Sequence, residues 1–312
     1  MKLKNGDLVD TMLLWKNEFI SYEVALNKSK NTISTYNDRL NCFIEFCHTI
    51  NDDRNIDTLK QMDIIKFFSW LDSVTIKKAT TKQSYLQVLK VFFNFISKNN
   101  DDLYLFDFLF DNFKIKVTNS KKLQNNYMND KERKNILTFI NYNLKKQPNF
   151  KNFRNSLLIK LLMLAGLRIS EALNLKLSDF QLNAEFYEIS ILGKGGNFQS
   201  AFIDKSVIEK EINYFDRNFD LNNFIFISKI NDKFPFSRNY AYLVLKRIYA
   251  KCGIFNKTGC HILRHSFAMN LLEHNVNIGV IQKALRHKKI QTTMIYADAN
   301  DEMVKKAVKV IS

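Results

Sequence analysis

The sequence contains little glycine, proline or cysteine. Of its 312 residues only 8 are glycine and 2 are proline, whereas Lys, Asn, Phe, Ile and Leu are plentiful. Because these two residues supply most turns, their scarcity favours a mainly helical protein. The four cysteines follow no regular spacing, which indicates reduced thiols rather than a disulfide framework.

Long apolar runs are also absent. The longest stretch, near 157–167, is interrupted by Lys160 and is too short to cross a bilayer. Acidic Asp7 and Asp10 occupy the positions where a secretory signal would have its basic region and apolar core. We therefore expect a cytoplasmic protein that has no membrane partner.

Acidic residues are too few to balance the basic ones. The net charge is +16, and residues 116–312 hold 32 Lys and Arg against 16 Asp and Glu, whereas residues 1–115 hold 15 of each. An AT-rich genome would enrich lysine without explaining this uneven distribution, so a polyanionic partner is favoured. The balanced part still contains an acid-free basic stretch over 76–100, with Lys77, Lys78, Lys82, Lys90 and Lys98.

Apolar spacing predicts a helical domain over 1–112. Its four amphipathic helices are expected over 11–25, 29–47, 60–71 and 80–97. The polar segment 113–128, which contains Lys121 and Lys122, cannot bury enough apolar surface to fold alone. We interpret it as a linker that either follows a phosphate backbone or is a solvated connector.

A second domain is predicted over 129–312. Helical patterns are expected at 129–139, 156–164, 167–177, 238–251, 261–273, 278–285, 291–296 and in a tail over 303–311. Tyr187, Ile189 and Ile191 alternate with polar residues, as in a strand. The glycine-rich turn at 193–196 then predicts a β-hairpin with Lys194 at or beside its tip. The fold class is therefore mainly α with a small β-hairpin or sheet.

Two short segments of this domain combine arginine with a carboxylate or a histidine. Arg168 is expected inside an apolar helix, with Glu171 three residues later on the same face. A buried arginine needs an anion or a carboxylate, so a purely structural pair remains an alternative. His261 and Arg264 share a helical face and suit a phosphate, since arginine offers a planar fork and histidine a proton donor. His265 is expected to be structural.

A third segment places His287 nine residues before Tyr296. Together with Lys194, the arginines and His261, these side chains match the needs of phosphodiester transesterification. The reaction needs cations for the non-bridging oxygens, an acid for the leaving alkoxide and a covalent nucleophile.

Metal and nucleotide sites are disfavoured by spacing. The set Cys252, Cys260, His261 and His265 follows C-x7-C-H-x3-H, which is not a standard zinc finger. No P-loop or Rossmann glycine pattern occurs.

Four segments, in order, resemble those of the tyrosine recombinases (phage-integrase family). They are A-G-L-R-I-S-E-A-L, I-L-G-K-G-G, H-I-L-R-H-S-F-A and L-R-H-K-K-I-Q-T-T-M-I-Y. Each is weak evidence alone, but four in order are specific. The resemblance spans residues 10–312, and within the family the chain looks most like the Xer group.

The resemblance implies a role for each of these side chains. Arg168 and Arg264 would clamp the scissile phosphate, supported by Glu171, while His261 and His287 would hydrogen-bond its oxygens. Lys194 would protonate the departing 5′ oxygen. Tyr296 would attack phosphorus and form a 3′-phosphotyrosyl bond, with no metal, ATP or other cofactor.

The resemblance also implies an architecture and partners. A helical core-binding (SAM-like) domain and a mixed α/β catalytic domain would clamp double-stranded DNA at a pseudo-palindromic site, as a homotetramer on two sites. The tail helix would dock on a neighbouring protomer or on its own domain. Xer proteins act on the bacterial nucleoid with the DNA translocase FtsK. Lysines expected to contact DNA are Lys77, Lys78, Lys82, Lys90, Lys121 and Lys122.

Two positions depart from the family pattern. Arg286 stands where a glycine usually precedes the histidine, and Gln199 where many members have a basic residue. Neither is expected to touch the catalytic set. The function favoured is Xer-type resolution of chromosome dimers at a dif-like site. Alternatives are a mobile-element integrase, a non-catalytic DNA-binding protein and a type IB topoisomerase.

Overall fold

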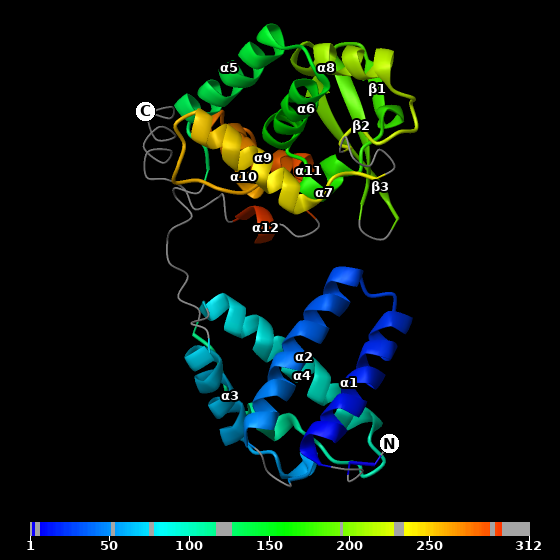
Figure 1. The fold of residues 1–312 in the computed structure, drawn as a ribbon, viewed down its shortest axis with the longest axis vertical. Coiled ribbons are helices and arrows are strands. Elements are labelled where there is room, and N and C mark those ends of the chain that lie inside the picture. Colours follow the sequence, from blue (N-terminus) through cyan, green and yellow to red (C-terminus); the bar gives the residue numbers. More distant parts are fainter. Residues whose placement is uncertain are drawn as a thin grey trace. The chain divides into compact units, whose positions relative to one another are not determined.

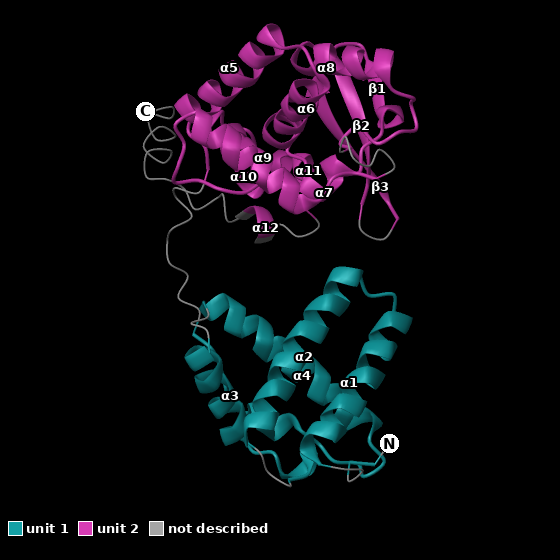
Figure 2. Ribbon diagram, viewed as in Figure 1, with its two compact units in different colours: residues 1–120 teal, residues 121–312 magenta. Residues whose placement is uncertain are grey.

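The chain divides into two compact units, Met1–Ser120 and Lys121–Ser312 (Figure 2). The computed structural model describes residues 2–3, 7–50, 54–74, 78–116, 127–193, 196–227, 234–287 and 291–294. Within these segments, no helix combines the length and the apolar character that crossing a membrane requires.

Unit 1 is helical throughout its described part (Figure 1). Its α-helices are α1 (Leu8–Ala25), α2 (Lys30–Ile50), α3 (Gln61–Val74) and α4 (Ala79–Asn99). Two short 3-10 helices accompany them: η1 (Ile56–Thr58) lies between α2 and α3, and η2 (Asp107–Phe110) follows α4. The four helices predicted from apolar spacing are confirmed, with ends that differ by a few residues.

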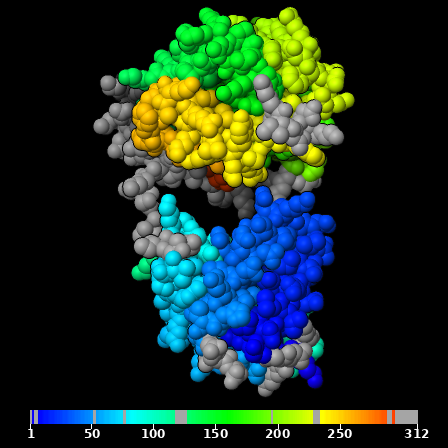
Figure 3. All heavy atoms as spheres, viewed as in Figure 1, coloured from blue at the N-terminus to red at the C-terminus, as the bar shows by residue number. Residues whose placement is uncertain are grey.

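Phenylalanine rings fill the core of unit 1. Phe43 is fully buried and contacts Phe67 edge-to-face, with ring centroids 5.0 Å apart. Phe93 packs on the same ring of Phe43 at 6.0 Å. Such edge-to-face pairs add stability beyond the burial of their area. The outward faces of α1 and α2 cover much of the side of unit 1 seen in Figure 3.

Unit 2 combines helices with one small sheet (Figure 1). Its helices are α5 (Asp130–Lys146), α6 (Phe150–Leu164), α7 (Ile169–Leu173), α8 (Lys205–Asn218), α9 (Arg238–Lys251), α10 (His261–Glu273), α11 (Ile278–Ala284) and α12 (Gln291–Met294). The described strands are β1 (Phe180–Asn183), β2 (Phe186–Leu192) and β3 (Phe198–Asp204), paired antiparallel in the order β1-β2-β3.

The sheet buries one face against the helices. Tyr187, Ile189 and Ile191 of β2 are buried while their neighbours are exposed or half-buried, which is the alternation expected of a half-buried strand. Ile189 is opposite Ala201 of β3. The predicted hairpin is confirmed, and β1 adds a strand that the sequence did not predict.

The helix predicted over 167–177 is wrong in extent. Only α7 is helical there, because Gly166 has a left-handed φ of +62° and Arg168 is extended, with φ −74° and ψ 148°. A 3-10 helix, η4 (Leu177–Asp179), and strand β1 follow. Arg168 therefore precedes the helix instead of lying inside it.

The other predicted helices of unit 2 agree better. Those over 238–251 and 261–273 are confirmed as α9 and α10. The predicted tail helix over 303–311 lies outside the described residues, as do Lys77, Lys121 and Lys122.

Candidate active site

Arg168 is the N-cap residue of α7 and bonds twice to Glu171. Its backbone N–H donates to Oε2 of Glu171 at 2.8 Å, and its guanidinium donates to Oε1 at 2.7 Å. The Arg168 side chain is nevertheless 36% exposed. Part of this guanidinium can therefore reach an anion that arrives from solvent.

Arg264 is buried in α10 and joins three distant segments. Its guanidinium donates to the carbonyl oxygens of Gly166, between α6 and α7, and of Leu285, at the end of α11. Nη1 of Arg264 also lies 3.7 Å from Oε2 of Glu171. The two predicted arginines thus meet at one carboxylate.

Arg286 is a third arginine on the same carboxylate. Its Nη2 donates to Oε2 of Glu171 at 2.9 Å and to the Gly166 carbonyl at 3.1 Å. Arg286 was expected not to touch the catalytic set, and its bond is to Glu171, the supporting carboxylate, which also contacts Arg168 and Arg264. Gly166 and Glu171 lie more than 100 residues from Arg286 in the sequence, so the replaced glycine was the only local signal of these two contacts.

Arg168 and Arg286 keep Glu171 ionised. Burial alone would raise the pKa of this carboxyl, but the N–H of Arg168 and the guanidinium of Arg286 lower it below its ordinary value. One carboxylate with three guanidinium groups leaves the cluster with a net positive charge. Such a cluster attracts a phosphate, since preorganised cations stabilise charge that develops on its oxygens.

The backbone carbonyl of Gly166 accepts hydrogen bonds from both buried arginines, Arg264 and Arg286. A Cβ at this position would lie 2.4 Å from Cδ1 of Phe267, and the left-handed φ also disfavours any side chain. The sequence contained Gly166 within a motif, but it gave no sign that the carbonyl would accept from Arg264 and Arg286.

His287 lies beside this cluster and is held by α12. Its Nδ1 is 2.9 Å from Oγ1 of Thr293, a fully buried residue that the sequence did not single out. Burial and the cations Arg264 and Arg168 lower the pKa of His287 from 6.5 to about 4. The imidazole is therefore neutral at pH 7 and can both donate and accept a hydrogen bond.

His261 and His265 lie on α10 with Arg264. His261 is the first residue of the helix and is exposed, and His265 is half-buried. Partial burial together with Arg264 and Arg168 lowers the pKa of His261. Burial and His261 lower that of His265. Both imidazoles are therefore protonated less readily than a free histidine.

The thiols near α10 are not activated. Burial raises the pKa of Cys260 to about 11, so its sulfur is protonated at neutral pH. Among the segments that the structure describes, no three His, Cys, Asp or Glu side chains gather as metal ligands.

Lys194 and Tyr296 lie outside the described residues. Gly193 and Asn197 flank Lys194 in the sequence. The N–H of Gly193 donates to the Asn197 carbonyl at 2.8 Å and closes the β2–β3 hairpin. Tyr296 follows Thr293 by three positions. The roles of both residues remain predictions.

The predicted DNA-contacting lysines of unit 1 have varied surroundings. Lys78 is exposed at the N-terminus of α4. Lys82 is half-buried and pairs with Asp72. Lys90 is exposed, with its amine 5.8 Å from the centroid of the Phe110 ring.

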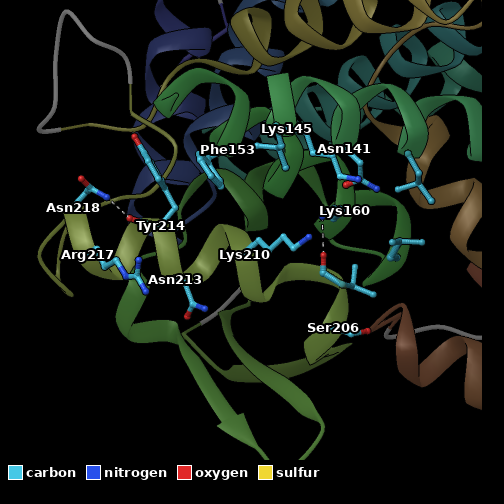
Figure 4. A pocket seen from close by; sticks show the side chains of 14 residues that line it. Asn141, Lys145, Phe153, Lys160, Ser206, Lys210, Asn213, Tyr214, Arg217 and Asn218 are labelled. Carbon is cyan, nitrogen blue, oxygen red and sulfur yellow. Dashed lines mark hydrogen bonds between the residues drawn. The ribbon is translucent and has the colours of Figure 1, made fainter. Parts of the chain in front are cut away.

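Two of the cavities that described residues line are in unit 2. One, of about 730 Å³, is bordered by Arg286 and His287 and by β3 and α11, with Gln199 in its wall. The other, of about 800 Å³, lies between α5, α6 and α8 and shares no lining residue with the first (Figure 4). Arg217, which is exposed and lines only the second of these two cavities, therefore serves as a charge control for the arginine cluster.

Comparison with known proteins agrees with this geometry. Residues 126–303 match the phage integrase family, and residues 17–100 match the phage integrase N-terminal SAM-like domain. The chain belongs to the phage integrase family, the tyrosine recombinases. The family, fold class and enzyme class predicted from the motifs are confirmed.

The relatives carry Xer names. Tyrosine recombinase XerH of Campylobacter jejuni is 28% identical over 300 residues, which cover 92% of this chain and 80% of the relative. Tyrosine recombinase XerC of Rickettsia canadensis is 32% identical over 279 residues, with 86% and 87% covered. A crystal structure of XerH bound to a palindromic difH substrate, post-cleavage, has the same fold. Its TM-score is 0.80 and its identity 22%, over 99% of this chain and 98% of that one.

Proposed function

We propose that this recombinase cleaves and rejoins double-stranded DNA through a covalent bond between Tyr296 and a 3′ phosphate. The observation that carries the proposal is the convergence of Arg168, Arg264 and Glu171, with His287 alongside and bonded to Thr293. Tyr296 follows this threonine closely in sequence.

The arginines bind the scissile phosphate. Arg168, which is partly exposed, donates to one non-bridging oxygen, and Arg264 compensates the charge that grows in the transition state. Glu171 holds both guanidinium groups in place before DNA arrives, so little reorganisation is needed during the reaction.

The nucleophile and the acid complete an exchange of esters. The phenolic oxygen of Tyr296 forms a bond to phosphorus while the bond from phosphorus to the 5′ oxygen breaks. Lys194 gives its proton to that 5′ oxygen, and the tyrosine proton passes to His287 or to water. A 5′ hydroxyl from a partner duplex later reverses the steps. Each ester replaces another, so neither metal nor ATP is required.

Neutral histidines suit this role. His287, whose pKa is about 4 in the free protein, can accept the tyrosine proton once the phosphate adds negative charge nearby. His261 donates a hydrogen bond to a phosphate oxygen.

The substrate we favour is a dif-like pseudo-palindrome, where recombination resolves chromosome dimers. Support comes from the Xer names of the relatives and from the difH DNA in the XerH structure. Four protomers would act on two sites on the bacterial nucleoid, in the cytoplasm, with FtsK as an activating partner. A mobile-element integrase remains the second candidate, because the chemistry is the same.

Sequencing the DNA that is trapped on the protein tests the proposal. Cells that express the tagged chain are lysed in denaturant, and DNA that stays attached to the protein is sequenced. We expect one short palindromic sequence near the replication terminus, and none with Tyr296→Phe.

Other outcomes identify the alternatives. Sequences that flank a mobile element would favour an integrase, and sequences without a common site would favour a topoisomerase. An adduct that persists with Tyr296→Phe would remove Tyr296 from the mechanism.

A further inference from the structure

Arg286 has a backbone conformation that is unfavourable for its side chain. Its φ is +54°, in the left-handed region that glycine adopts freely and long side chains rarely adopt. Such a conformation persists only where the surrounding contacts hold it, and residues of this kind concentrate at functional sites.

The contacts that hold Arg286 come from several segments. The side chain is 3% exposed, and its Nη1 donates to the Ala284 carbonyl at 2.9 Å. Nη2 is shared between the Gly166 carbonyl and Oε2 of Glu171. One guanidinium thus links the turn after α11 to the turn between α6 and α7 and to the first helical residues of α7.

Arg286 and Arg264 use the same acceptors. Both donate to the Gly166 carbonyl, and both lie near Oε2 of Glu171, at 2.9 Å for Arg286 and 3.7 Å for Arg264. Arg286 makes the closer ion pair. Arg286 also directly precedes His287, so the backbone conformation of Arg286 helps to set the position of the His287 side chain.

We propose that Arg286 is a positioning residue for the cleavage reaction. By sharing the Gly166 carbonyl and Glu171 with Arg264, it fixes the guanidinium of Arg264 and the imidazole of His287 relative to the scissile phosphate. The inference rests on the proposed function, because it assumes that these two groups contact the phosphate.

A structural ion pair is the competing interpretation. It predicts that loss of Arg286 lowers stability, and lowers cleavage only in proportion to the folded fraction. The positioning role predicts a loss of cleavage rate in protein that is folded and saturated with DNA. A misplacement of about 1 Å at reacting groups costs about 100-fold in rate.

The test uses the full chain with two substitutions at this position. Arg286→Asn tolerates the left-handed backbone but lacks the guanidinium, and Arg286→Lys keeps one cation without the planar fork. Ala184→Gly is the backbone control, since Ala184 also has a positive φ, 49°, at the turn between β1 and β2. Arg217→Ala, in the remote cavity of Figure 4, is the charge control.

The first readout is the rate of covalent adduct formation on a nicked duplex of the sequence recovered by trapping. At saturating DNA we expect Arg286→Asn to be slower by about 10-fold to 100-fold, Arg286→Lys to be intermediate and both controls to match the unsubstituted chain. DNA affinity, measured by gel shift, is expected to be unchanged in all four.

The second readout needs no DNA. Arg264, Arg168, Arg286 and His265 all face His287 and, with burial, lower its pKa to about 4. In Arg286→Asn an NMR titration should show this pKa moving up toward 6.5, whereas Arg217→Ala should leave it unchanged.

Two results would overturn the inference alone: an Arg286→Asn adduct rate equal to that of the unsubstituted chain, or a loss that matches the unfolded fraction. If the unsubstituted chain forms no adduct on any duplex, the proposed function fails and the inference falls with it.

Discussion

The two units differ in what they bury. Unit 1 buries rings: Phe19, Phe43, Phe67, Phe92 and Phe93 are almost fully inaccessible, and few charged side chains accompany them. Unit 2 buries a comparable apolar core together with charged groups, among them Arg133, Arg154, Lys160, Glu211, Arg264 and Arg286. Its stability therefore depends on pairing as well as on packing.

This difference separates a unit that is held by packing from one that is held by packing and charge pairs. A buried ring is stabilised by contact area and is insensitive to pH. A buried charge is tolerated only while its partner is present, and the desolvation that makes it costly also strengthens its effect on a bound phosphate. Changes of volume should therefore act on unit 1, and changes of charge and pH on unit 2.

The largest expected effect is on the rings of unit 1. Phe43→Ala removes a side chain that contacts Phe67 and Phe93, and we expect the free energy of unfolding of unit 1 to fall by about 4 kcal/mol. Tryptophan fluorescence in a urea titration reports this unit, because both Trp15 and Trp70 belong to it. Leu103→Ala, at a side chain that is 85% exposed, is the control. Equal losses in the two variants would contradict a ring-stabilised core.

The second-largest loss of stability is expected from breaking the buried ion pair between Lys160 and Glu211 in unit 2. Lys160 donates to the Val207 carbonyl at 2.8 Å and pairs with buried Glu211, so Lys160→Met leaves an uncompensated carboxylate. We expect a loss of about 3 kcal/mol. Hydrogen exchange of α6 and α10 amides would measure it. The double change Lys160→Met with Glu211→Leu should recover most of the stability, and a double variant no better than the single one would refute charge burial as the cause.

The effect of pH should be smaller and confined to unit 2. His287 has a folded pKa of about 4 and an unfolded value of 6.5, so the unfolded chain binds more protons between these pH values. Stability is therefore complete above pH 6.5 and decreases as the pH falls. Between pH 7 and pH 5 we expect a loss of at most about 2 kcal/mol, because solvent screens this partly exposed imidazole, and hydrogen exchange of α10 would measure it. His287→Gln should reduce this loss, and an undiminished loss would place its origin elsewhere.

The smallest loss of stability is expected from removing a helix N-cap side chain, and it should be the same in both units. The side chain of Asp7 accepts from the N–H of Asp10 at the start of α1, and that of Asn129 accepts from Glu132 at the start of α5. Replacing either by Ala should cost about 1 kcal/mol, since each satisfies one free N–H. Urea titrations followed by tryptophan fluorescence for unit 1 and by hydrogen exchange for unit 2 would compare the two losses. A much larger loss in one unit would mean that helix ends, and not core contents, distinguish the two.

The sequence predicted most of the helices because their apolar residues recur at helical spacing. The bounds of α9 and α10 are those predicted, since each has turn residues on both sides. The stretch 167–177 misled the prediction because its apolar spacing continues past α7, whereas the chain turns at Gly166 and leaves the helix at Asn174. Strand β1 is four residues long and mostly exposed, so it has no alternation to detect.

The sequence predicted the part of the candidate site that lies in local motifs. Local motifs named Arg168, Arg264 and His287, and the structure brings these residues together around Glu171. The contacts of Arg286 with Gly166 and of His287 with Thr293 depend on how α6, α11 and α12 pack. The spacing of residues within one segment cannot predict such tertiary contacts. The parts played by Gly166, Thr293 and Arg286 were therefore found only in the structure.

The single carbonyl oxygen of Gly166 accepts from two guanidinium groups at once. The two cations are consequently mechanically coupled: a shift of this peptide plane displaces both in the same direction. A substitution that alters this turn should therefore move both guanidinium groups. A change near the separate acceptors, the Leu285 carbonyl for Arg264 or the Ala284 carbonyl for Arg286, should act on one of them first.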